Sequence, residues 1–199
     1  MLDSGGHYLT GTTDITRTIP LGELTDEERE NYTAVLKAHI QLALAKFKKG
    51  ATGYALDAIT RQPIWRLGKD YKHGTGHGVG MVLSVHEGPQ SISTKMLDVP
   101  MELGMVTSDE PGIYIAGKHG IRIESLIATI PYCENEHGTF YQFETITICP
   151  IDVRPVLKER MLQEEIDWLN AYHEKVYQVL EKRVAPDMLP FLKEKTKKI

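Results

Sequence analysis

The sequence is poor in the features that mark secreted and membrane-spanning proteins. It has two cysteines in 199 residues, Cys133 and Cys149, and they lack the spacing of a redox or zinc motif. We therefore expect reduced thiols rather than a disulfide framework. No apolar run approaches the ~18 residues that a membrane span requires, and the first residues lack the basic and apolar blocks of a signal peptide. These features favour a cytoplasmic protein that does not bind a membrane.

The sequence also lacks an excess of positive charge. Its 23 lysines and arginines are outnumbered by 27 aspartates and glutamates, which gives a formal net charge of −4. Nucleic acids and anionic membranes require a basic surface, so we expect neither as a partner. The basic run at residues 193–198 is typical of a solvated helix end. The length and the hydrophobic content of 41% fit one globular domain, alone or with a small appendage.

The first third of the chain predicts a hairpin followed by two helices. Residues 1–20 are rich in β-branched residues broken by glycines, which is typical of a β-hairpin. A capping box at Thr25 starts a helix whose apolar spacing continues until Gly50. Residues 54–61 predict a shorter helix, and Pro63 should force a break or a new start.

The middle of the chain predicts strands and loops. Alternating apolar residues over 79–85 indicate a strand, and the polar residues 90–101 indicate a loop. Further strands are predicted at residues 105–110, 121–130 and 140–149. The order of elements predicts an α+β fold.

The last quarter of the chain changes composition after Pro150 and predicts helices. One apolar stripe runs along a helix that could pack on its own domain or on a partner subunit, and a short helix follows it. We therefore divide the chain into residues 1–150 and a helical C-terminal extension, residues 151–199. The stripe consists of Ile166, Leu169, Tyr172, Val176, Val179 and Leu180.

A glycine-histidine loop, HGTGHGVG at residues 73–80, is the strongest candidate for a functional segment. Glycine permits close backbone approach, and neutral imidazole is the commonest side-chain metal ligand. The loop therefore suggests a metal ion held by His73 or His77, although a histidine in a glycine-rich turn can also be an ordinary loop residue.

Four carboxylates lie next to turn residues or within strands, at Asp3, Asp14, Glu110 and Glu124. Each could be a solvated turn residue, but Glu124 lies in an apolar strand and needs a partner there. If the four converge, they repel one another unless cations neutralise them. Two divalent ions would match their charge, and oxygen ligands with one imidazole suit Mn²⁺, Co²⁺, Fe²⁺ or Zn²⁺.

The motifs together resemble those of the Xaa-Pro aminopeptidases, members of the pita-bread metallopeptidases. The resemblance is carried by the following segments: DSG at 3–5, DITRT at 14–18, GTGHGVG at 74–80, VHEGP at 85–89, DEPG at 109–112, GIRIE at 120–124 and FET at 143–145. It implies a pita-bread fold, with a mostly antiparallel curved sheet covered by helices. The family also has an upstream helical region, so we expect this fold to be N-terminally incomplete and the chain alone to be a poor catalyst.

The resemblance implies a set of metal ligands. Asp14, His77, Glu110 and Glu124 would hold the first ion, while Asp3, Asp14 and Glu124 would hold the second. The ions would be divalent, with Mn²⁺ expected and Co²⁺ or Zn²⁺ as alternatives.

The resemblance also implies catalytic roles and partners. Glu110 would shuttle the proton of the nucleophilic water, His86 would contact the substrate carbonyl, and His73 would line the site. Arg122 would brace a ligand carboxylate. The expected substrate is a peptide with proline at the second position, and the expected assembly is a homodimer. An Xaa-Pro dipeptidase (prolidase) and a non-catalytic peptide-binding or interaction fragment are the alternatives.

Overall fold

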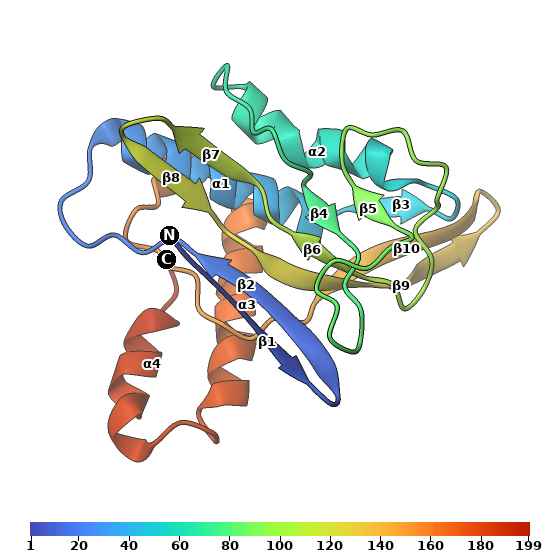
Figure 1. The fold of residues 1–199 in the computed structure, drawn as a ribbon. Coiled ribbons are helices and arrows are strands. Elements are labelled where there is room, and N and C mark those ends of the chain that lie inside the picture. The colour runs from blue at the N-terminus through green and yellow to red at the C-terminus, as the bar shows by residue number, and fades with distance from the viewer.

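The computed structural model describes residues 1–199 and begins with the predicted hairpin (Figure 1). Strands β1 (Leu2–Tyr8) and β2 (Gly11–Arg17) pair antiparallel, with Asp3 opposite Thr16 and Gly5 opposite Asp14. Thr16 also forms a β-bridge with Glu124, more than a hundred residues away in sequence. The hairpin is thereby attached to the segment that carries another predicted metal ligand.

Helix α1 (Asp26–Ala43) begins at the predicted capping box, where Thr25 and Glu28 bond to each other's backbone N–H groups. The prediction that this helix reaches Gly50 is wrong. Strand β3 (Lys46–Lys48) follows it and pairs with β10, and the ring of Phe47 packs 4.9 Å from that of Phe143. Beyond Ala43 the apolar residues keep a helical spacing, but packing of Phe47 against the sheet overrides it.

Helix α2 (Gly53–Trp65) contains Pro63, so the predicted break at this proline is also wrong. Pro63 lies in the last turn of the helix, so its missing N–H costs a single backbone bond, the one to the carbonyl of Ile59. The backbone N–H of Arg66 still reaches Gln62 and closes the helix.

The main sheet has the strand order β3-β10-β9-β6 and lies beside α1 (Figure 1). Its long strands are β6 (Val106–Asp109), β9 (Ser125–Asn135) and β10 (Gly138–Thr145), near the predicted positions. An additional strand that the sequence did not predict, β7 (Gly112–Ile115), pairs with β8 (His119–Arg122). The predicted strand 121–130 is therefore two strands, and Glu124 lies between them.

The strand predicted at residues 79–85 is wrong. The glycine-histidine loop contributes only β4 (Gly76–His77), which pairs with β5 (Ser91–Ile92), and the segment between them consists of bends with one β-bridge, from Gly78 to Thr107. The backbone N–H of Gly80 donates to the carbonyl of Ser84 within this segment, while Met81 and Leu83 are 70% and 71% exposed. Alternation alone does not supply a neighbouring strand to pair with.

The C-terminal part consists of η1 (Lys158–Arg160), α3 (Gln163–Leu180), η2 (Pro186–Met188) and α4 (Leu189–Lys195). The predicted apolar stripe of α3 packs within the chain, because Ile166, Leu169, Tyr172 and Val176 share one buried core with α1. Residues of both predicted parts thus contribute to the same core, and the α+β prediction is confirmed. None of the helices has the length and apolar character needed to cross a bilayer.

Candidate metal centre

A cleft of about 330 Å³ opens where the hairpin, the glycine-histidine loop and the ends of β6 and β8 meet. The side chains that line it include six of the residues predicted from sequence: Asp3, Asp14, His77, His86, Glu110 and Glu124. They come from segments spread over 122 positions of the sequence, from Asp3 to Glu124.

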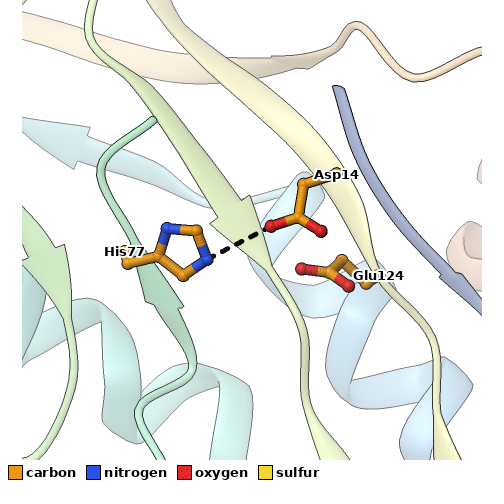
Figure 2. A group of neighbouring side chains, drawn as sticks. All are labelled: Asp14, His77 and Glu124. Carbon is orange, nitrogen blue, oxygen red and sulfur yellow. Dashed lines mark ion pairs between the residues drawn. The ribbon is translucent and has the colours of Figure 1, made fainter. Parts of the chain in front are cut away.

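Three of these lining side chains point toward one another (Figure 2). Asp14 lies on β2, His77 on β4 and Glu124 between β8 and β9, and each offers one ligand atom within 4.8 Å of the other two. His77 Nε2 lies 3.4 Å from an oxygen of Asp14. Glu110 adjoins the group, with its Oε1 atom 3.5 Å from His77 Nε2.

The backbone around His77 orients its imidazole. Its Nδ1 atom lies 3.0 Å from the carbonyl oxygen of Gly78 and so donates its proton there, which leaves Nε2 facing Asp14 and Glu110. Burial lowers the pKa of His77, but the nearby carboxylates outweigh burial and raise it. The same Nε2 lone pair that would take a proton from solution is available to a metal ion.

Glu110 and Glu124 have strongly raised pKa values. Burial is the largest cause for both: it raises the pKa of Glu110 to about 7 and that of Glu124 to about 8, against partial relief from hydrogen bonds. The charges of Asp14, Asp3 and Glu110 raise the pKa of Glu124 further. Carboxylates that are crowded together in this way repel one another, because the site holds too little positive charge to compensate them.

This donor set fits divalent cations. It offers carboxylate oxygens and one correctly oriented imidazole nitrogen, and Arg122 compensates its negative charge only in part. Divalent ions would supply the missing charge. Asp14, His77 and Glu124 therefore fit a divalent metal ion.

Asp3 lies apart from the converging group. Its side chain is half exposed and pairs with Arg122, whose Nε also donates to Thr16 at 3.1 Å and lies 3.9 Å from Glu124. Arg122 thus touches Asp3 and approaches Glu124, two of the three ligands that the resemblance assigns to the second ion.

The two predicted catalytic histidines differ in their surroundings. His73 lies beside the cleft, 4.0 Å from Glu110; its Nδ1 donates to the carbonyl of Gly74 and its Nε2 accepts from the hydroxyl of Tyr114. Burial lowers the pKa of His73. His86 is exposed at the rim, and its ring lies 4.2 Å from that of His77.

Several residues of the site were missed at the sequence level. The Thr16 hydroxyl donates to Glu124, and the Ser108 hydroxyl accepts from the backbone of His77 and donates to Glu110 at 3.1 Å. Tyr114 links His73 to Arg122. Thr16 lies in the DITRT motif and could have been found there, whereas Ser108 and Tyr114 have ordinary strand positions that carry no signal.

The sequence matches metallopeptidase family M24 over residues 1–130 and the C-terminal region of that family over residues 139–199. Aminopeptidase P1 of Arabidopsis thaliana is 43% identical over the whole chain, which covers 32% of that protein. A probable Xaa-Pro aminopeptidase P of Neurospora crassa is 47% identical over 88% of the chain and 26% of its own length.

Solved structures give the same result. A Caenorhabditis elegans X-prolyl aminopeptidase, described as a cytosolic enzyme with a dinuclear active site, matches with a TM-score of 0.93 and 42% identity, over 99% of this chain and 33% of its own. A prolidase from Pyrococcus furiosus matches with a TM-score of 0.58 and 40% identity, over 63% of this chain and 36% of its own. The chain thus has the pita-bread fold and spans about a third of the length of these relatives. By its sequence and its fold, the chain belongs to metallopeptidase family M24.

Proposed function

We propose that this chain carries the metal centre of an Xaa-Pro aminopeptidase, which hydrolyses the bond between an N-terminal residue and a following proline. The convergence of Asp14, His77 and Glu124 next to Glu110 carries the proposal, because it assembles a ligand set from distant segments. The names of the relatives in Arabidopsis and Caenorhabditis support the reaction.

In the proposed centre, Asp14, His77, Glu110 and Glu124 hold one divalent ion, and Asp3, Asp14 and Glu124 hold the other. When bound, the ions would acidify a nucleophilic water and polarise the scissile carbonyl. Manganese is the proposed metal, with cobalt or zinc as alternatives.

The chain's own residues supply the proton transfers. Glu110 lies in the cleft with its Oε1 atom 3.5 Å from His77 Nε2, where its carboxylate can accept the proton of the nucleophilic water and return it. His86 is exposed at the rim, where it can donate to the substrate carbonyl. Arg122 holds Asp3 in place, and the hydroxyl of Tyr114 orients His73 beside Glu110.

A dipeptidase acting on Xaa-Pro is the nearest alternative, since prolidases share the fold. The structural match to the aminopeptidase covers nearly the whole chain and that to the prolidase covers 63%, which favours the aminopeptidase. A non-catalytic binding role has less support, because it would leave the convergence of these metal-ligand types unexplained.

The test is hydrolysis by the protein that contains this chain, loaded with Mn²⁺. It should cleave a tripeptide with proline at the second position faster than the matching dipeptide, and a chelator should abolish turnover. A tripeptide with alanine at the second position serves as the control. Preference for the dipeptide would support the prolidase alternative, and turnover that survives metal removal would contradict both.

We further propose that residues 151–199 act as a C-terminal extension, that the protein forms homodimers and that it is cytoplasmic. The description of the Caenorhabditis relative as cytosolic supports the location. Light scattering at micromolar concentrations tests the dimer, and a monomeric mass would contradict it.

A further inference from the structure

Arg17, at the end of β2, is an unusual residue of this fold. It lies three residues beyond the proposed ligand Asp14, only 6% of its surface is exposed, and no carboxylate forms an ion pair with it. A buried guanidinium without an acidic partner is costly unless neutral acceptors satisfy its N–H groups. The structure supplies those acceptors from several segments.

The guanidinium binds backbone carbonyls of three segments and two side-chain hydroxyls, one of them on α3. Its Nη1 group donates to the carbonyls of Thr16 at 2.9 Å and Glu124 at 2.5 Å. The remaining bonds run from Nε to Pro150 O at 2.9 Å, and from Nη2 to Cys149 O at 2.8 Å, Tyr172 Oη at 3.0 Å and Ser125 Oγ at 3.4 Å.

These bonds fix two proposed ligands relative to each other. One nitrogen of Arg17 holds the carbonyls of Thr16, two residues after Asp14, and of Glu124 itself. The backbone N–H of Glu124 donates to Thr16, and the Thr16 hydroxyl donates to the Glu124 carboxylate. The spacing between Asp14 and Glu124 therefore depends on this guanidinium.

Two aromatic residues of helix α3 support the segments that carry the proposed ligands. The Tyr172 hydroxyl accepts from Arg17, and the Tyr172 ring stacks on Trp168 with ring centroids 5.2 Å apart. Trp168 meets the buried ring of His39 edge-on at 5.9 Å, and His39 Nδ1 contacts Asp109, the neighbour of Glu110. One face of α3 thus supports both sides of the cleft.

We propose that Arg17 and Tyr172 are positioning residues of the metal centre, through which helix α3 sets the spacing between Asp14 and Glu124. This inference rests on the proposed function, because it concerns the ions proposed there. The planar fork of arginine is required, since lysine offers one charged nitrogen and cannot reach all of these acceptors. The C-terminal region then contributes to metal binding without supplying a ligand.

The test compares Mn²⁺ binding by the chain and by two variants, Tyr172→Phe and Arg17→Lys. Calorimetry gives the affinity, electron paramagnetic resonance reports the coupling between neighbouring ions, and thermal unfolding without metal reports the fold. Tyr172→Phe keeps the ring that stacks on Trp168 and so should keep the fold, but it removes a buried hydroxyl that accepts from Arg17 and donates to the Cys149 carbonyl, so the metal-free unfolding temperature should fall. Its Mn²⁺ affinity should fall about tenfold, as is typical when support of a ligand is lost.

Tyr177→Phe is the matched control, because Tyr177 lies on the same helix and its hydroxyl makes no hydrogen bond within the chain. It should leave affinity and spectrum unchanged. Arg17→Lys should weaken binding more than Tyr172→Phe and reduce the coupling between the ions. If both variants bind Mn²⁺ within twofold of the unsubstituted chain with an unchanged spectrum, the inference is overturned, whatever happens to the unfolding temperature. Failure of the complete protein that contains this chain to bind Mn²⁺ would instead overturn the proposed function, and the inference with it.

Discussion

The molecule contains two buried polar clusters that treat charge in opposite ways. In the first, Arg61 donates to Asp57 at 2.6 Å, to Asp70 at 2.7 Å and to the carbonyls of Tyr71 and His73. In the second, the cleft, carboxylates converge and their pKa values rise. In the first cluster the buried carboxylate of Asp57 is paired with a cation of the chain and so serves the fold, whereas in the second the carboxylates outnumber the single arginine and need further positive charge.

The comparison separates structural charge from functional charge. The other oxygen of Asp57 accepts from the Thr75 hydroxyl at 2.6 Å, so both carboxylate oxygens of this residue are satisfied. Glu124 has one hydroxyl donor, three acidic neighbours and one arginine, Arg122, whose Nε lies 3.9 Å away and does not reach hydrogen-bond distance. A carboxylate that the chain leaves uncompensated destabilises the fold, so its presence indicates binding of a cation.

The largest expected effect concerns metal binding in the cleft. His77→Ala removes the nitrogen ligand, so Mn²⁺ affinity should fall on the order of 100-fold or more. The metal-free unfolding temperature should change little, because the side chain is partly exposed. Calorimetric titration measures the affinity, and His137→Ala, at an exposed turn between β9 and β10, is the control. Unchanged affinity in His77→Ala would place the ions elsewhere.

A substitution in the cluster around Arg61 should have the opposite effect, because it should lower stability rather than metal affinity. Arg61→Ala leaves the buried carboxylate of Asp57 without its cation, so the free energy of unfolding should fall by about 3–5 kcal/mol. Chemical denaturation of the metal-free chain measures this loss. Arg66→Ala, at the exposed end of the same helix and outside any ion pair, should cost little. Equal losses for the two variants would show that the pairing of Arg61 with Asp57 does not contribute to the free energy of unfolding.

The metal-free chain should lose stability as pH rises from 6.5 to 8. The folded pKa values of Glu110 and Glu124, about 7 and 8, lie above their ordinary value of 4.5, so the folded state keeps protons that the unfolded state has released. The raised pKa of His77 acts in the same direction, because its stabilisation is lost as pH rises through that pKa.

The window begins at 6.5 because His73 and His173, whose pKa values are lowered by burial, act in the opposite direction below that value. The unfolding temperature should fall by about 5 °C across the window. Saturating Mn²⁺ should remove most of this dependence. A flat profile in the metal-free chain would contradict the charge argument.

Sequence reasoning located the proposed ligands because turns and strand ends mark them locally. It failed where distant partners decide the outcome. Phe47 has helical spacing yet joins the sheet, since Phe143 lies nearly a hundred residues further along the chain. Residues 79–85 alternate without a neighbouring strand, and Pro63 is tolerated because it lies in the last turn of α2.

The same limit applies within the site. Arg17 stands in the DITRT motif, yet its acceptors are carbonyls more than a hundred residues away, which no local pattern indicates. Tyr114 lies on β7, a strand that the sequence did not predict, so its contact with His73 could not be anticipated. Ligand types can be predicted from short motifs, but the groups that orient them require the fold.

The smallest expected effect concerns Glu124, where one substitution should raise stability and weaken metal binding. Glu124→Gln removes a buried charge that has three acidic neighbours, while the amide oxygen can still accept from the Thr16 hydroxyl. At pH 8 the metal-free variant should be more stable than the original chain by on the order of 1–3 kcal/mol. At pH 5 the gain should vanish, because Glu124 is then protonated in the folded state.

Denaturation at both pH values measures the difference for Glu124→Gln, and Glu134→Gln, at an exposed position of β9, should show no gain at either. The variant should bind Mn²⁺ weakly, since it has lost a proposed ligand. A stabilised chain that no longer binds the ion is the expected mark of a residue kept for function at a cost in stability. If Glu124→Gln is less stable at pH 8, the carboxylate is compensated within the chain, and the two clusters do not differ as argued.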